Sequence, residues 1–243
     1  MDTTSPDRQG SVSSSSVKRL LERYTGRHAL LEHEVKGILR EMGLSVPLGV
    51  FIGRGEPLVP PSGLSYPLVA KVSAAGISSK SNLRGVRTGL KDEGALRAAA
   101  ADLMEIGKAE GVLVEEMAPS GIEIIAGGIV DSQFGPVVMF GMGGILVELL
   151  RDSSFALAPL SRGDALWLIG QSRGRALLEG YRGNPPVDKE ALVCILLAVS
   201  EIMATGMVEE VDLNPVALYP EGAMILDAKL LLRHSDTAAR WSG

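Results

Sequence analysis

Two oxygen-bearing side chains near the C-terminal end of the chain, Asn214 and Asp227, have the types and the spacing of metal ligands. They lie in EEVDLNPVALYPEGAMILDAKL, residues 209–230, where alternating apolar residues flank a Pro-Glu-Gly break at 220–222. This pattern predicts two strands joined by a turn, with Asn214 and Asp227 facing each other across the ladder. An amide oxygen beside a carboxylate suits Mg²⁺, which takes its remaining ligands from water and nucleotide phosphates. The alternative is a plain hairpin in which Asn214-Pro215 is a turn and Asp227 ends a strand.

A lysine interrupts the apolar run YPLVAKV, residues 66–72, which predicts a buried strand. Burying an ammonium group alone is costly, so Lys71 requires an anionic partner or a route to solvent. The partner is either a carboxylate of the protein or a nucleotide phosphate, which lysine suits as a compact point charge. The Gly- and Ser-rich segment that follows, residues 73–90, contains Lys80 and offers backbone amides that can hold phosphate oxygens.

The predicted hairpin over residues 121–144 carries an isolated glutamate. Two long apolar strands flank a turn at 131–135, and Glu123 stands alone among apolar residues in the first of them. In an alternating strand such a residue faces outward. Its functional alternative is a polar contact on the nucleotide side.

Helical and strand patterns elsewhere define the elements that must position these side chains. Apolar residues at helical spacing predict helices over 17–42, with a break near Gly26, and over 91–111, after Ser161 and over 189–204. Short apolar runs predict further strands over 48–52 and 111–119. Together these patterns favour an α/β protein with a mostly antiparallel sheet.

Composition excludes several classes of function. The net charge is −5, with no Lys/Arg cluster, and only 4% of residues are aromatic, so a nucleic-acid surface is not expected. No apolar run reaches the roughly 18 residues that span a bilayer. The Ser-rich N-terminus lacks the apolar core of a secretory signal. The single cysteine, Cys194, suits a reducing compartment, and a cytoplasmic location is expected.

Several motifs, taken in order, resemble the nucleotide-binding subunit of the NDP-forming acyl-CoA synthetases, which are ATP-grasp relatives of succinyl-CoA synthetase. The most specific is DLNPV followed by LDAK, in the stretch that contains Asn214 and Asp227. The others are LLEHEVK, VLVEEMAP, GIEIIAG, QFGPVVMFGMGG and LLEGYRGNPP. The resemblance covers about residues 30–232.

The resemblance implies an ATP-grasp fold of the α/β (α+β) class, in which the nucleotide lies between two lobes. The smaller lobe is expected over about residues 46–112, and the larger lobe over 17–45 plus 113–235. Residues 1–16 would form a disordered Ser-rich tail and residues 236–243 a C-terminal tail.

The resemblance also assigns roles around a bound ATP or ADP. The residues expected at the phosphates and at Mg²⁺ are Lys71, Asn214 and Asp227. The residues expected at the adenine, through backbone groups and an acidic side chain, are Glu115, Glu116 and Met117. Arg182, in GYRGNPPVD, either approaches the transferred phosphoryl group or holds its own loop in place. In such sites the metal and the lysine neutralise charge on the transferring phosphoryl group.

One departure from the family pattern bears on the phosphoryl route. The family has a segment close to HKSDxGGV, whose histidine is phosphorylated in part of the family. Here Ser79 stands in place of that histidine, Asn82 in place of the aspartate and Arg84 in place of the first glycine. A serine hydroxyl is not a labile phosphoryl carrier at neutral pH, so a relay through residue 79 is not expected.

The resemblance implies that the chain acts with a CoA-binding, alpha-type partner subunit that carries a phosphohistidine and binds most of the acyl-CoA. Together they would interconvert acyl-CoA, ADP and phosphate with carboxylate, CoA and ATP, the phosphoryl group passing directly from the partner histidine to ADP. The alternative is a non-catalytic or regulatory nucleotide-binding subunit, suggested by Ser79. Both presumed metal ligands are present, which argues against that alternative.

Overall fold

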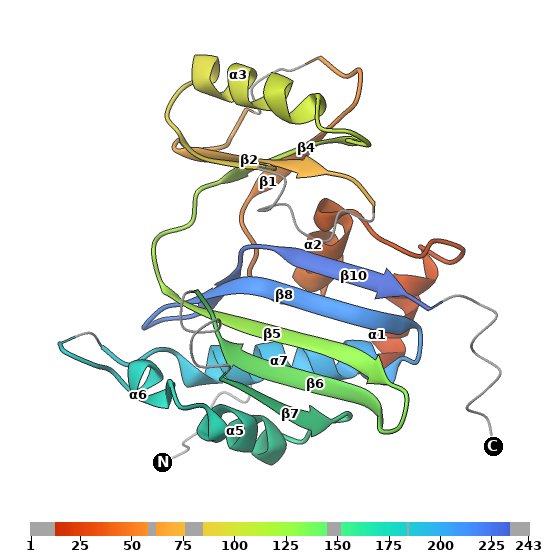
Figure 1. Cartoon of the computed structure of the whole chain (residues 1–243), viewed down its shortest axis with the longest axis vertical. Coiled ribbons are helices and arrows are strands. Elements are labelled where there is room, and N and C mark those ends of the chain that lie inside the picture. Colours follow the sequence, from red (N-terminus) through yellow and green to blue (C-terminus); the bar gives the residue numbers. More distant parts are fainter. Residues whose placement is uncertain (1–12, 58–61, 76–84, 145–151, 184, 234–243) are drawn as a thin grey trace, which may run out of the picture.

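A computed structural model describes residues 13–57, 62–75, 85–144, 152–183 and 185–233. Within these ranges the chain forms two sheets, one in each of two lobes stacked along the long axis (Figure 1). The strand pairs in both sheets are antiparallel throughout the described ranges. The expected two-lobed architecture with antiparallel sheets is therefore confirmed.

The smaller lobe is a four-stranded sheet with one helix on its outer face. In spatial order the strands are β1 (Gly49–Gly53), β4 (Gly111–Glu116), β2 (Leu68–Ser73) and β3 (Val86–Leu90). Leu68, Ala70 and Val72 pack into a core with α3 (Glu93–Met104). Because side chains alternate along a strand, Lys71 and Ser73 face the opposite side, towards the larger lobe.

The larger lobe is a six-stranded sheet with helices behind it. The spatial order is β10-β8-β5-β6-β7, and β9 pairs with β8 off this path. The strands are β5 (Ile122–Asp131), β6 (Gly135–Met142), β7 (Ser153–Leu157), β8 (Val208–Leu218), β9 (Ala223–Ile225) and β10 (Ala228–Leu232). The helices are α1 (Ser14–Glu22), α5 (Arg162–Gln171), α6 (Arg175–Leu178) and α7 (Lys189–Ala204).

Helix α7 provides most of the helical side of this core. It begins at a capped end, where the Asp188 carboxylate accepts the Ala191 N–H at 3.0 Å. Its apolar side chains, including Leu196 and Val199, pack with Phe140 of β6 in one buried cluster. Full burial of each such side chain contributes about 1.5–3 kcal/mol, so this cluster fixes the sheet from behind.

Helix α2 (Glu32–Glu41) connects the two lobes. Val35 and Leu39 belong to the core of the larger lobe. The first turns of the same helix face the smaller lobe, where the His33 ring stacks on Phe51 of β1 with centroids 4.1 Å apart. One helix therefore carries side chains into both halves of the molecule.

The helix expected over 189–204 is present over those residues, and the expected cap at Ser161 accepts the Asp164 N–H at 3.2 Å. Two boundaries differ from expectation. Strand β4 continues in the smaller sheet to Glu116, past the expected lobe boundary at 112, and α1 begins at Ser14, inside the expected tail. In addition, the second strand of the C-terminal hairpin is divided into β9 and β10. No helix in the described part of the chain combines the length and apolarity needed to cross a membrane.

Candidate functional site

The division between β9 and β10 places Asp227 directly beside Asn214. The Asn214 N–H donates to the Asp227 carbonyl at 3.2 Å, and the Leu226 N–H donates to the Pro215 carbonyl at 3.0 Å. The next residues along the strands, Ala228 and Leu213, are paired in register. The structure thus brings the two oxygen-bearing residues together, while their role as metal ligands stays a prediction.

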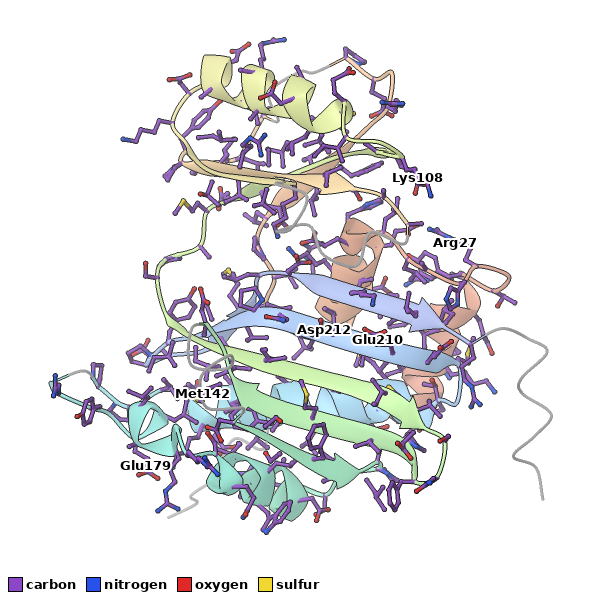
Figure 2. The ribbon with its side chains drawn as sticks, viewed as in Figure 1. Arg27, Lys108, Met142, Glu179, Glu210 and Asp212 are labelled. Atoms are coloured by element: carbon purple, nitrogen blue, oxygen red, sulfur yellow. The ribbon has the colours of Figure 1, made fainter. Side chains whose placement is uncertain are left out.

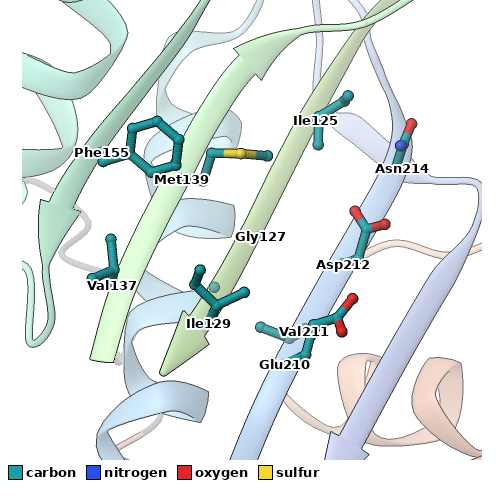
Figure 3. Close-up of a pocket in the computed structure, with 11 residues that line it drawn as sticks. Ile125, Gly127, Ile129, Val137, Met139, Phe155, Glu210, Val211, Asp212 and Asn214 are labelled. Carbon is teal, nitrogen blue, oxygen red and sulfur yellow. The ribbon is translucent and has the colours of Figure 1, made fainter. Parts of the chain in front are cut away.

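A further carboxylate, which the sequence analysis missed, lies two residues before Asn214 on the same face of β8. Asp212 and Glu210 project from this strand (Figures 2 and 3). Burial is the main cause that raises the pKa of Asp212, to about 6, and the nearby carboxylates of Glu210 and Asp227 raise it further. The ammonium of Lys229 opposes this shift. Negative charge is therefore concentrated beside the candidate metal pair, which favours a bound cation.

The face of the larger sheet that α7 does not cover is hollowed next to these residues. The hollow is lined on β8 by Glu210, Asp212 and Asn214 and on the neighbouring strands by apolar side chains such as Met139 and Phe155 (Figure 3). No cluster of three or more His, Cys, Asp or Glu residues able to hold a metal occurs among the described residues. Mg²⁺ commonly completes its ligand set with water and nucleotide phosphates.

Lys71 does not lie alone in its buried strand. We call Glu32, Lys36, Lys71 and Glu115 the buried charge quartet. The Lys71 ammonium lies 2.7 Å from Glu32 Oε1 and 2.9 Å from Glu115 Oε2. The Lys36 ammonium lies 2.8 Å from Glu32 Oε1 and 2.6 Å from Glu115 Oε1. Two cations and two anions, all buried, therefore balance each other between the lobes.

Both ammonium groups of the quartet also bind one backbone carbonyl of the larger lobe. Leu226 O accepts from Lys36 at 2.7 Å and from Lys71 at 2.5 Å. Leu226 immediately precedes Asp227, so the buried lysine of the smaller lobe and the candidate metal ligand meet at one point of the chain. This contact joins the two halves of the predicted site.

The electrostatic environment keeps Lys71 charged. Burial alone lowers the pKa of Lys71, but the carboxylates of Glu32, Glu115 and Asp227 outweigh burial and hold it above its usual value. Burial has the largest effect on Lys36 as well, and together with the neighbouring Lys71 ammonium it leaves the pKa of Lys36 below its usual value. Lys71 is therefore the more firmly protonated of the two.

The residues predicted at the adenine lie at the end of β4 in different environments. The Glu115 carboxylate is committed to the two lysines of the quartet, whereas Glu116 Oε1 accepts the Ser65 N–H at 2.7 Å. Met117 is exposed, and its N–H donates to the Pro67 carbonyl at 3.0 Å. Their role at an adenine stays a prediction.

Two of the remaining predicted residues, Glu123 and Arg182, are exposed. Glu123 is exposed on β5, and its carbonyl accepts the Gly143 N–H at 2.7 Å. Arg182 is exposed in the loop after α6, its guanidinium 5.3 Å from the centre of the Tyr181 ring. Figure 1 shows that the segment after α6 extends sideways from the larger lobe, apart from β2, and the role of Arg182 stays a prediction. Lys80, with Ser79 and Arg84, lies outside the described residues.

The sequence analysis missed Glu32 and Lys36 as members of the site. The available signal is their spacing of four residues, which puts both charges on one face of α2. They alternate there with Val35 and Leu39, which face the core. Charged residues that flank a buried stripe are candidates for a buried ion pair.

The fold and the site together define a class. The ATP-grasp domain family matches residues 22–232, and the chain belongs to the ATP-grasp family. Within it, the chain is homologous to the beta subunits of ADP-forming acetyl-CoA synthetases. The Pyrococcus furiosus acetate–CoA ligase (ADP-forming) I subunit beta is 38% identical over 212 residues, covering 84% of this chain and 91% of the relative.

Longer relatives contain the same region. Acetate–CoA ligase (ADP-forming) II of Archaeoglobus fulgidus is 40% identical over 204 residues, which cover 84% of this chain but only 30% of that protein. Among solved structures, acetyl-coenzyme A synthetase 1 of Ca. Korarchaeum cryptofilum, in complex with coenzyme A and Ca-AMPCP, superposes with a TM-score of 0.81 at 38% identity. The match covers 90% of this chain and 100% of that one.

Proposed function

We propose that the chain is the ATP-grasp subunit of an ADP-forming acyl-CoA synthetase and transfers a phosphoryl group between a partner-subunit phosphohistidine and ADP. One observation carries the proposal: the buried Lys71 ammonium binds the carbonyl of Leu226, next to Asp227, which lies beside Asn214. A phosphate-binding cation from one lobe and a pair of metal-binding oxygens from the other thus converge. The homology to ADP-forming acetyl-CoA synthetase beta subunits supports it.

Nucleotide phosphates are the ligand that this charge pattern fits. Lys71 supplies a fixed positive charge from β2, and the oxygens of Asn214 and Asp227 form a hard-oxygen pair suited to Mg²⁺. When bound, Mg²⁺ would neutralise negative charge on the phosphates. Asn214 and Asp227 would hold it there, while Lys71 orients the terminal phosphate oxygens.

The transfer itself requires no covalent intermediate on this chain. In the ATP-forming direction the P–N bond of the partner phosphohistidine breaks, and a P–O bond forms to a terminal oxygen of ADP. The electron pair of the broken bond returns to the imidazole nitrogen. This chain contributes position and charge, which account for most of the catalysis in phosphoryl transfer.

A partner subunit is required by this assignment. In a second structure of the Korarchaeum enzyme, with coenzyme A and Mg-AMPPCP, a phosphohistidine segment points towards the nucleotide-binding site. We propose an equivalent CoA-binding, alpha-type partner here, which would bind most of the acyl-CoA. The relatives are ligases, so a non-catalytic nucleotide-binding role is not favoured.

Calorimetric titration with ADP, in Mg²⁺ and in EDTA, tests the proposal on the complex co-purified with its partner. Mg²⁺-dependent binding is expected, together with formation of ATP from acyl-CoA, ADP and phosphate. Asp227→Ala should weaken MgADP binding by about 10- to 100-fold, because it removes a metal ligand. Glu221→Ala, an exposed carboxylate in the same hairpin, is the matched control and should bind as the wild type does.

Three outcomes separate the possibilities. Binding and turnover, both lost in Asp227→Ala, support the proposal. Mg²⁺-dependent binding without turnover would replace it with a regulatory nucleotide-binding subunit. Absence of nucleotide binding by the complex would contradict both.

A further inference from the structure

Helix α5 carries apolar residues on both of its faces. Ala165, Leu168 and Ile169 are buried on the side that packs against β7 and α7. On the opposite side Leu166 is 42% exposed and Trp167 is 54% exposed. A helix that is apolar all round is normally covered on every side. The described residues of a single chain therefore leave the outer face of α5 uncovered.

The exposed residues of this outer face follow the spacing of a helix contact. Four of them recur at i, i+3, i+4 and i+7, namely Gly163, Leu166, Trp167 and Gly170. We call these four residues the outer stripe. This is the spacing by which one helix packs along another. A Cβ added at Gly170 would meet no atom within 4 Å, so this end of the stripe is open to a neighbouring backbone.

The outer stripe is self-complementary when two copies of α5 run antiparallel. In a two-fold contact, residue i of one copy meets residue j of the other, and j meets i. With the two-fold axis midway between Leu166 and Trp167, the Leu166 of each copy meets the Trp167 of the other. Each Gly163 then meets a Gly170, and two glycines permit a close approach of the helices. Large side chains thus fill the centre of the contact and glycines lie at its ends.

The polar residues beside the outer stripe also fit a second copy. Asp164 and Gln171 are exposed and seven residues apart, so they lie on one flank of the stripe. In the antiparallel pair, Asp164 of one copy lies beside Gln171 of the other, whose amide can donate to the free lone pairs of the carboxylate. The other flank carries Arg162, whose guanidinium is neutralised by Glu190 at 2.5 Å. One flank is therefore complementary to itself, and the other is already paired.

We propose that the outer face of α5 is an interface at which two copies of this chain associate. The two α5 helices run antiparallel, with Trp167 at the centre of the contact. Figure 1 shows α5 below the larger sheet and the smaller lobe above it, so the contact does not involve the junction between the lobes. The inference uses no residue of the nucleotide site and is independent of the proposed function.

The size of the helix sets the expected strength of the association. Helix α5 has 10 residues, so the contact buries less than the about 1,600 Å² of a standard interface. We therefore expect a reversible dimer with a Kd in the micromolar range. Tryptophan is among the residue types that dominate the binding energy of an interface, so Trp167→Ala should raise this Kd by about 30-fold or more.

Sedimentation velocity of the full-length chain, from low to high micromolar concentration, measures the association. The wild type should pass from monomer to dimer, and both Trp167→Ala and Gly170→Glu should shift this transition to higher concentration. The glutamate is free of steric conflict in the single chain, but in the dimer it would place a charge beside Asp164 of the second copy. Phe134→Ala is the matched control, because Phe134 is an aromatic residue of the same lobe that is 66% exposed. It should dimerise as the wild type does.

Thermal unfolding of each variant separates a loss of association from a loss of folding. Trp167 is exposed, and glutamate is a better helix former than the glycine at residue 170. Both variants should therefore unfold near the temperature of the wild-type monomer. Should Gly170→Glu fail to fold, Trp167→Ala decides.

Weaker dimerisation of Trp167→Ala and Gly170→Glu, with unchanged dimerisation of Phe134→Ala, supports the interface. A wild-type chain that stays monomeric at high micromolar concentration would overturn it. Dimerisation that the folded Trp167→Ala and Gly170→Glu variants retain would also overturn it, because the dimer would then use another surface. The same measurement on the co-purified complex covers a third result. A monomeric chain whose Trp167→Ala variant loses the partner subunit would assign the face to that subunit and exclude a second copy.

Discussion

Each member of the buried charge quartet depends on the others. Removing a charged group from water costs several kcal/mol, and the attraction between partners offsets that cost only where geometry is good. Here Glu115 accepts from Lys36 with both oxygens and lies 2.9 Å from Lys71, while only 3% of its side chain is exposed. Loss of this carboxylate leaves two ammonium groups to share Glu32.

Glu115→Gln should consequently lower the free energy of unfolding by about 3 kcal/mol, because a buried ion cluster loses one partner. The adjacent Glu116 gives a matched comparison, since its carboxylate binds the Ser65 N–H at a partly exposed position. Glu116→Gln should cost about 1 kcal/mol or less. Urea unfolding monitored by circular dichroism measures the free energy of unfolding of both variants. Equal decreases in the two variants would show that burial of the carboxylate does not determine how much its removal destabilises the protein.

At the scale of elements, Asp188 fixes the start of α7 to the β8–β9 turn. Its carboxylate accepts the Ala191 N–H at 3.0 Å and the Gly222 N–H at 2.9 Å. Asp188→Ala should destabilise the protein at pH 7 by about 2 kcal/mol, the upper range for a helix cap. Asp92→Ala is the comparison, because that carboxylate caps α3 through the Ala95 N–H alone, and it should cost about 1 kcal/mol.

The Asp188 effect should also depend on pH, with a defined sign. The Ala191 N–H, followed by the Gly222 N–H, lowers the pKa of this carboxyl in the folded state. The stabilisation is thus fully present above the unfolded pKa of about 3.9 and is lost as pH falls through the folded value. Urea unfolding at pH 7 and at pH 3 should show a smaller difference between wild type and Asp188→Ala at the lower pH. A difference that grows on acidification would contradict this assignment.

The sequence predicted helices well where residues near one another in the chain determine them. The apolar run and the preceding aspartate determine α7 from Lys189 to Ala204, and Ser161 with Asp164 caps α5. Within the charge quartet only the Glu32–Lys36 pair, four residues apart on α2, is local, because other bonds of the quartet join residues 39 and 79 apart in the sequence. The carbonyl of Leu226 binds lysines 155 and 190 residues away. The sequence therefore predicted Lys71 as a buried cation in need of a partner and left that partner undecided between carboxylate and phosphate.

At the scale of the molecule, the two lobes have separate hydrophobic cores. One cluster surrounds α3 and the smaller sheet, and the other surrounds α7 and the larger sheet. Helix α2 and the quartet join them, through Glu32 and Lys36 on one side and Lys71 and Glu115 on the other. A ligand that binds at this junction contacts both cores at once.

MgADP should therefore protect backbone amides in both lobes from hydrogen exchange. The added stability at a nucleotide concentration of about 100 times Kd is about 2.7 kcal/mol, and the slowed amides should include β2 and β4 in the smaller lobe and β8 and β10 in the larger. The outer helix α5 should change little, because it packs on β7 and α7, away from the junction. Exchange followed by mass spectrometry, with Asp227→Ala as the non-binding control, measures the pattern. Protection confined to one lobe would show that the nucleotide does not bridge the two lobes. The hydrogen bond from Lys71 to the Leu226 carbonyl, next to Asp227, would then have a structural role alone.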